Sequence, residues 1–198
     1  MNQKAEKGQA TRRLIVEAAR GLFAAHGYAE VSIEQVLRAS GVSRGALYHH
    51  FAGKEALFEA VVEATATEVA TKVVARSAGA RDVLVGLLAG CDAFLELAQD
   101  PAVRQIVLAD APSVLGWARW REIDARHGFG LLKASLARAS AGGALPAELV
   151  EPFAHMLLAS LAEVALMIAR AGGDAAALER GKAAAHALLQ RMLRPAAP

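Results

Sequence analysis

The stretch that decides the fold runs from Ser32 to Phe51 and reads SIEQVLRASGVSRGALYHHF. It contains two short helical segments, with Gly41 between them to supply a turn conformation that side chains resist. Ser32 and Gln35 have the spacing of a capping box, which marks the start of the first segment. Ser43 is a favourable N-cap for the second segment. Two short helices joined by a glycine-containing turn follow the helix-turn-helix plan.

The second of these helices has two unlike faces. At about 100° per residue, Leu47 and Phe51 fall together and form the buried side. Gly45, Ala46 and His49 centre the opposite side, where small residues let the backbone approach the bases of a major groove. We expect an arginine at the edge of this face to read a guanine, the alanine to touch a thymine methyl group, and the remaining groups to reach phosphates. The predicted DNA-contacting residues are Thr11, Arg12, Arg13, Ser32, Ser43, Arg44, Gly45, Ala46, Tyr48, His49, His50 and Lys54.

Helical periodicity and glycine or proline punctuation continue on both sides of this motif. The polar residues 1–9 are expected to be disordered, and a first helix is expected from Thr11 to about Gly27. No segment alternates apolar and polar residues over strand length, so the predicted fold is all-α. Further helices are expected at about 33–40, 43–51, 54–76, 81–99, 102–110, 114–140, 147–171 and 174–193.

Composition excludes several classes of protein. Hydrophobic residues make up 55% and charged residues 21%, as in a globular chain. Residues 1–54 hold eight Lys or Arg and four Glu, a net charge of +4, while the remainder carries −2 of the total +2. A basic end suits a polyanionic partner. A single cysteine, Cys91, excludes an intrachain disulfide.

The apolar segment from Phe153 to Ile168 is interrupted by His155 and Glu163, which argues against a membrane span. The N-terminal residues lack the apolar run of a signal peptide. A cytoplasmic protein without a cofactor is therefore expected.

Several of these residues also fit patterns found in other classes of protein. Gly41 to Gly45 matches the G-x-S-x-G pattern of hydrolases, but that elbow needs a strand before the serine, and a helix precedes it here. Neighbouring His49 and His50 point about 100° apart on a helix and do not readily share an ion. Asp124 and His127 have a chelating spacing, although a solvated or packed pair is favoured. Cys91 is read as a small core residue, with a redox sensor as the alternative.

The segment from Arg13 to Phe58 resembles the DNA-binding domain of the TetR (tetracycline-repressor-like) family almost end to end. The resemblance implies a homodimer with a variable C-terminal helical domain that binds a small molecule and controls DNA binding. We therefore expect a DNA-binding domain over residues 10–70, with the motif at about 33–52, joined by a long helix to a ligand-binding and dimerisation domain over 77–198. Ala46 and Gly53 depart from the polar residues that the family often has there. The matching elements are Ala18, Leu22-Phe23, Gly27-Tyr28, Ser32-Ile33, Val36, Ala39, Gly41-Val42-Ser43, Gly45, Leu47-Tyr48, Phe51 and Lys54-Glu55-Leu57.

Two sets of apolar residues in the C-terminal half predict a ligand pocket and a dimer interface. Aromatic residues there either line a ligand pocket or pack in the core, and the scarcity of convergent charges favours a hydrophobic effector. The helix at 147–171 has two apolar stripes, and one of them needs a partner such as a second copy of the chain. The predicted pocket residues are Cys91, Phe94, Leu115, Trp117, Trp120, Phe129 and Met156. The predicted dimer-interface residues are Phe153, Leu157, Leu161, Ala165, Ile168, Leu188 and Met192.

These features predict a ligand-responsive transcriptional regulator, and more specifically a repressor that a small hydrophobic effector releases from operator DNA. An activator or a ligand-independent regulator of the same fold is the first alternative. A helical enzyme would need convergent acid, base or metal groups, which the sequence does not offer. A nonspecific DNA-coating protein would use phosphate contacts alone.

Overall fold

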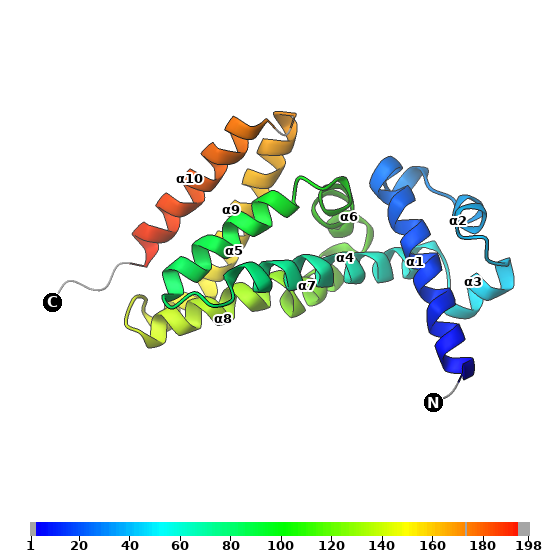
Figure 1. The fold of residues 1–198 in the computed structure, drawn as a ribbon, viewed down its shortest axis with the longest axis horizontal. Helices are drawn as coiled ribbons and strands as arrows, with labels where there is room; N and C mark the ends of the chain where they lie inside the picture. Colours follow the sequence, from blue (N-terminus) through cyan, green and yellow to red (C-terminus); the bar gives the residue numbers. More distant parts are fainter. Residues whose placement is uncertain (1–2, 173, 194–198) are drawn as a thin grey trace. The chain divides into compact units, whose positions relative to one another are not determined.

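The computed structural model describes residues 3–172 and 174–193, and over these residues it contains helices and no strands (Figure 1). The all-α prediction is confirmed. In chain order the elements are α1 (Gln3–Glu30), α2 (Ile33–Ser40), α3 (Arg44–His50), α4 (Lys54–Ser77), α5 (Val83–Leu97), the π-helix η1 (Val103–Asp110), α6 (Ala111–Val114), α7 (Gly116–Arg126), α8 (Gly128–Ala141), the 3-10 turn η2 (Ala147–Leu149), α9 (Val150–Arg170) and α10 (Ala175–Met192).

The chain divides into two compact units. Unit 1 comprises Met1–Thr65 with Pro101–Trp120, and unit 2 comprises Ala66–Asp100 with Arg121–Pro198. Helix α4 is the long helix expected after the helix-turn-helix, and its residues belong to both units. The sequence-based boundaries did not anticipate that residues 101–120 pack with the N-terminal helices.

Helix α1 is the centre of unit 1. Its buried stripe, which includes Ile15, Ala19 and Phe23, packs against α2, α3 and η1. The expectation that residues 3–9 are disordered is wrong, because α1 begins at Gln3; residues 1 and 2 lie outside the described chain. The hydroxyl of Thr11 donates to the Lys7 carbonyl at 3.0 Å, as in a helix interior, instead of capping a new helix.

The end of α1 is fixed by a glycine and an aspartate. Gly27 has φ 76° and interrupts the helix, as expected from its place as a C-terminal cap. The Tyr28 N–H that follows donates to the Asp110 carboxylate at 2.8 Å. Gln105 donates to the other oxygen of the same carboxylate at 3.0 Å. Asp110 thereby links η1 to the break in α1.

The helix expected over 114–140 is instead two helices. The backbone at His127 (φ −120°, ψ −100°) separates α7 from α8. A Cβ on Gly130 would lie 2.4 Å from the Ala125 carbonyl oxygen, so the close return of the chain requires glycine there.

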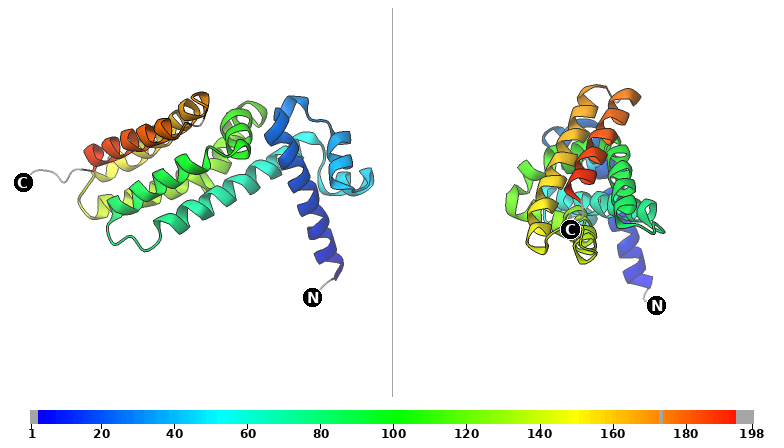
Figure 2. Two further views of the ribbon diagram at one scale, coloured as in Figure 1. Left: turned by 45° about the horizontal axis from the view of Figure 1, so that its top comes forward. Right: turned by 90° about the vertical axis from the view of Figure 1, so that its left-hand side faces the viewer.

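Unit 2 is a helical bundle in which α10 packs against α5 and α9, and α9 packs against α8. Figure 2 shows α9 and α10 running side by side. Their close approach occurs at Gly181, which is buried; an added Cβ would lie 2.8 Å from Ile168 Cδ1 and 2.9 Å from Val164 Cγ1. A glycine at the contact lets two helices pack at short range.

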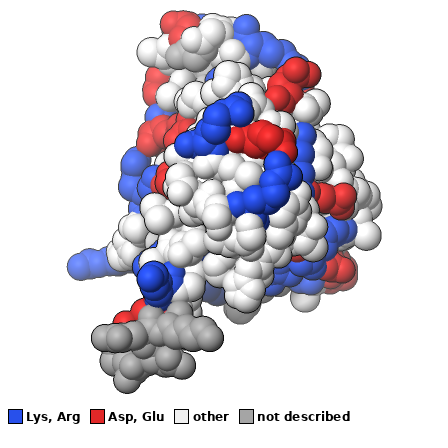
Figure 3. All heavy atoms as spheres, turned by 90° about the vertical axis from the view of Figure 1, so that its right-hand side faces the viewer, with Lys and Arg blue, Asp and Glu red and all other residues white. Residues whose placement is uncertain are grey.

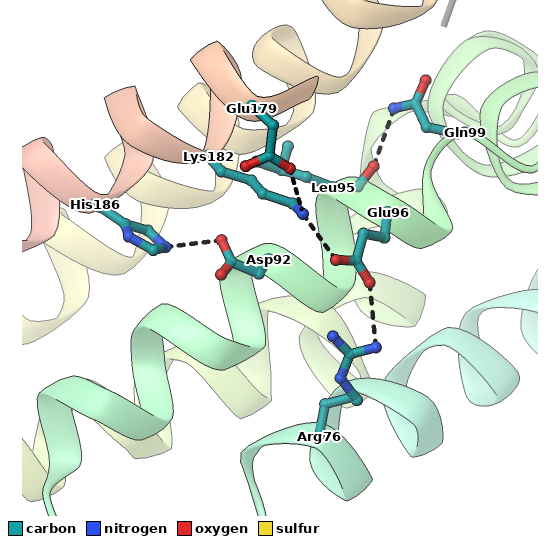
Figure 4. A network of polar contacts seen from close by, with 8 residues as sticks. All are labelled: Arg76, Asp92, Leu95, Glu96, Gln99, Glu179, Lys182 and His186. Carbon is teal, nitrogen blue, oxygen red and sulfur yellow. Dashed lines mark hydrogen bonds and ion pairs between the residues drawn. The ribbon is translucent and has the colours of Figure 1, made fainter. Parts of the chain in front are cut away.

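A polar network joins α10 to α5 and α4 (Figure 4). Lys182 donates to Glu96 at 2.8 Å and to Glu179 at 3.0 Å, and Arg76 pairs with the second oxygen of Glu96 at 3.1 Å. The hydrogen bond from Lys182 lowers the pKa of Glu96, and the bond to Glu96 raises the pKa of Lys182. His186 contacts Asp92 at 2.7 Å. Both carboxylates of α5 are thus engaged by α10.

One helix in the described part of the chain, Ala147–Arg170, is long and apolar enough to cross a membrane by length and composition. The sequence had indicated otherwise because His155 and Glu163 interrupt it. In the structure α9 packs against α5, α8 and α10, and a core helix of a soluble protein meets the same criterion.

Candidate nucleic-acid interface

Side-chain caps fix the geometry of α2 and α3. The Ser32 N–H donates to Gln35 Oε1 at 2.6 Å, and the Gln35 N–H donates to Ser32 Oγ at 3.2 Å, which completes the predicted capping box. Gly41 ends α2 in the left-handed conformation with φ 68°. The Ala46 N–H donates to Ser43 Oγ at 3.2 Å at the start of α3. The turn between the helices is therefore defined on both sides.

The inward face of the α2–α3 pair is buried, and its outward face is exposed to solvent. Val36 and Leu47 are at most 1% exposed, and Phe51 is 4% exposed. On the other side Tyr48 is 46% exposed and a Cβ on Gly45 would meet no atom within 4 Å. Helix α3 thus presents a narrow outward surface of small residues beside an exposed tyrosine. Figure 3, viewed from the side of α2 and α3, shows Lys and Arg groups around uncharged surface, with Asp and Glu groups among them.

Arg44, the predicted base-reading residue, stands at the first position of α3 with its side chain 60% exposed. One of its guanidinium nitrogens, Nη2, donates to Glu34 Oε1 at 2.7 Å. This contact crosses from α3 to the first turn of α2 and was not predicted from the sequence.

Lys54 has a different environment from the one expected of a phosphate-binding lysine. Its ammonium donates to the Ala29 carbonyl at 3.2 Å and lies 4.2 Å from the centre of the Tyr28 ring. The cation thereby compensates the carbonyl end of α1, which has no basic residue in its own last turn. An ammonium has three donors, so two remain for another acceptor.

The other predicted contact residues differ in their surroundings. Arg12, Arg13 and His49 are all exposed, and the Arg12 guanidinium lies 5.2 Å from the centre of the Phe51 ring. His50 is half-buried beside α1, where its Cε1 would lie 3.9 Å from a Cβ on Gly8. The hydroxyl groups of Thr11, Ser32 and Ser43 all take part in helix hydrogen bonds.

Comparison with known proteins agrees with this geometry. The family model of bacterial regulatory proteins of the tetR family matches residues 15–61, and the model of the tetracyclin repressor-like C-terminal domain matches residues 84–192. The chain belongs to the TetR family. A TetR-family transcriptional regulator from Pectobacterium atrosepticum is 32% identical, with 98% of each chain covered and a TM-score of 0.77.

Curated relatives match over part of their length. The HTH-type transcriptional repressor Rv1474c of Mycobacterium tuberculosis is 36% identical over 55% of this chain and 57% of its own. The HTH-type transcriptional repressor AcnR of Corynebacterium glutamicum is 40% identical over 42% of this chain and 43% of its own. The chain thus spans about half the length of the curated relatives it matches. Membership of a regulator family, together with the helix before Ser43, sets aside the hydrolase reading.

The residues predicted to line a ligand pocket are divided between the two units. Leu115, Trp117 and Trp120 belong to unit 1, and the other four belong to unit 2. Trp117 is 65% exposed and Met156 is 61% exposed. The two tryptophan rings lie 5.1 Å apart, so they do share one neighbourhood. Cys91 is 3% exposed, and burial raises the pKa of its thiol to about 12, which leaves it a protonated core residue and a poor redox sensor.

Most of the predicted dimer-interface residues lie inside the protomer. Leu157, Leu161, Ala165 and Ile168 are at most 5% exposed because they form the stripe of α9 that covers the core of unit 2. Of the assigned set, Phe153 and Met192 are half-buried and Leu188 is exposed. The large apolar side chains exposed on α9 are Met156 and Met167.

The alternative of a metal site has little support. Over the residues that the structure describes, no three His, Cys, Asp or Glu side chains gather as metal ligands. The Asp124 carboxylate pairs with Arg121 Nη1 at 3.1 Å, and burial raises its pKa.

The two residues that sequence reasoning missed are Glu34 and Asp110. Glu34 stands out in the sequence as the acidic residue in the first turn of α2, but its pairing with Arg44 depends on how the two helices pack. Asp110 contacts a backbone group 82 residues away, and no local pattern predicts such a contact.

A substitution at Gly45 should change the stability of the protein and its affinity for DNA in opposite directions. We expect Gly45→Ala to raise the stability of the protein by up to about 1 kcal/mol, because alanine favours helix and the new methyl group meets no protein atom. The same methyl group would stand between α3 and the bases, so affinity for a specific duplex should fall. Thermal melting and fluorescence anisotropy with labelled DNA measure the two effects.

Gly21→Ala is the matched control, since Gly21 is an exposed helical glycine with no atom near its Cβ position. It should stabilise α1 without changing DNA binding. Wild-type affinity in Gly45→Ala would show that α3 does not approach DNA through this face.

Proposed function

We propose that this chain is a homodimeric, sequence-specific DNA-binding regulator that represses transcription and is released by a small hydrophobic effector. The observation that carries the proposal is the capped α2–α3 pair, with α3 presenting its open face of small residues beside Arg44 and Tyr48. Such a face suits entry into a major groove, where an arginine reads guanine O6 and N7. Repression is favoured because the matched relatives Rv1474c and AcnR are named as transcriptional repressors.

The recognition test starts from a random-sequence duplex library, from which the wild-type protein should enrich one near-palindromic site. Arg44→Ala should then cost about 1–3 kcal/mol on that site and relax the preference at one base pair of each half-site, because a bidentate base contact is lost. Binding is measured by anisotropy at fixed salt.

Arg138→Ala on α8 is the control for loss of one positive charge, since Arg138 is exposed and lies outside unit 1. Failure of the wild-type protein to enrich any sequence would favour nonspecific coating. Unchanged preference in Arg44→Ala would refute the groove assignment.

The proposed dimer uses the α9–α10 pair. Only 28% of the most apolar stretch of Ala147–Arg170 is buried within the protomer, and Met156, Met167 and Leu188 remain exposed on the two helices. Exposed apolar surface of this kind is typical of an interface between protein chains. A dimer also supplies the fixed spacing of two α3 helices that a near-palindromic site requires.

Sedimentation should give a dimer at micromolar concentration in the absence of DNA. The double variant Met156→Glu/Met167→Glu should sediment as a folded monomer, because both side chains are exposed in the protomer and would carry charge into the interface. Val85→Glu, at a position 56% exposed on α5, should stay dimeric. A wild-type monomer, or a dimer unaffected by the double variant, contradicts the proposed interface.

The proposed effector is apolar because α5 offers few charges to a ligand. Its sequence, VLVGLLAGCDAFLEL, carries two acidic groups, and both pair with side chains of α10 or α4 (Figure 4). A pocket bordered by such a helix would be mainly apolar, as ligand pockets generally are. Coupling to DNA binding can use α4, whose residues belong to both units.

Tryptophan fluorescence provides the effector test, because Trp117 and Trp120 are the only two tryptophans and lie together. We expect some members of a library of apolar compounds to change the emission and to release the selected duplex over the same concentration range. Release caused only by phosphorylated or polycationic compounds would contradict an apolar effector. Fluorescence changes without release would show binding that is not coupled to DNA.

A further inference from the structure

The contact between Arg44 and Glu34 is the one ion pair within the described chain that joins α2 to α3. Arg44 Nη2 and Glu34 Oε1 are 2.7 Å apart, and the two side chains are 60% and 53% exposed. At such exposure an ion pair adds little to the stability of a protein. The ion pair therefore matters more for the orientation of the Arg44 side chain than for the stability of unit 1.

Both ends of this ion pair stand on rigid backbone. Glu34 lies inside the turn that the capping box of Ser32 and Gln35 closes. Arg44 directly follows Ser43, whose hydroxyl caps α3. The backbone positions of the two residues are thus fixed, and the flexible part is the long arginine side chain. A hydrogen bond at its tip restricts the orientations of the guanidinium plane.

The carboxylate leaves the arginine able to bind DNA. A guanidinium has five N–H donors, and the bond to Glu34 uses one nitrogen, Nη2, so donors remain for the O6 and N7 atoms of a guanine. A hydrogen bond from its own backbone amide and the bond from Arg44 lower the pKa of Glu34, so the group is charged near neutral pH. Arg38, one turn further along α2, is the other cation that acts on it.

A negative charge beside the recognition helix also affects DNA binding in general. It repels phosphates and weakens binding to every sequence alike, whereas an oriented arginine strengthens binding only where a guanine is in register. The first effect lowers affinity without changing the ratio of specific to nonspecific affinity, and only the orientation of the arginine increases that ratio.

We propose that Glu34 is a positioning residue for base readout, which holds the Arg44 guanidinium in the orientation that reads a guanine and thereby increases sequence discrimination. This inference rests on the proposed function of α3 as a DNA-recognition helix. It adds a specificity-determining residue, on α2, that does not itself contact a base.

The test uses Glu34→Gln in the full-length protein, which keeps the size of the side chain and removes its charge. The probes are the duplex enriched by the wild-type protein, the same duplex with the Arg44-dependent base pair replaced, and a random-sequence duplex. We expect affinity for random DNA to rise and the preference for the enriched duplex over the replaced one to fall by about five-fold or more, within the range of one bidentate contact. Thermal melting should be unchanged, because both side chains are exposed.

Two variants isolate the positioning effect. Glu30→Gln removes the same charge from an exposed site in unit 1 and should raise nonspecific affinity without loss of preference. In an Arg44→Ala background, Glu34→Gln should no longer change the preference, because the group that it positions is absent.

The outcomes separate this inference from the proposed function. If Arg44→Ala abolishes the preference and Glu34→Gln leaves it at the wild-type value, the positioning role is refuted and base reading by Arg44 stands. If Glu34→Gln increases the preference, Glu34 restrains Arg44 instead of presenting it, and the inference is again wrong. If Arg44→Ala itself has no effect on preference, the proposed recognition face fails first.

Discussion

The break in α1 at Gly27 is the constraint on which unit 1 depends. A left-handed residue at this point turns Tyr28 away from the helix axis, so that its ring packs 4.8 Å from Phe58 and 5.9 Å from Phe23. Phe23 and Phe58 lie edge to face at 5.1 Å and are fully buried. The backbone conformation of Gly27 therefore brings the end of α1 into contact with the start of α4.

The polar groups freed by that break receive partners from distant parts of the chain. Asp110 accepts the Tyr28 N–H, and Lys54 donates to the Ala29 carbonyl. A half-buried backbone N–H without a partner is costly, so the contact between Tyr28 and Asp110 favours a single arrangement of α1 and η1. The recognition helix is in turn held by the buried Leu47 and Phe51 against this assembly. The proposed recognition helix α3 and the segment 101–120 thus both pack against α1.

Glu34 and Lys54 show how charge is used differently at two places in the same unit. Lys54 serves the carbonyl end of α1 and the Tyr28 ring, so part of its bonding capacity is structural. Glu34 forms an exposed ion pair with little value for stability, and its effect falls on the arginine it contacts. The net charge of this end of the chain does not distinguish the roles of these two residues.

The sequence by itself determined the local features of this protein: the all-α class, the capping box at Ser32, the turn at Gly41 and the buried face of α3. These follow from periodicity and from side-chain caps that act within about four residues. Only the tertiary structure decided which stripe of α9 lies inside, because Leu157, Leu161 and Ala165 are buried when α9 packs against α8, α10 and α5. It likewise decided that residues 101–120 pack with α1, since an aspartate and a backbone amide 82 residues apart meet only when the chain has folded.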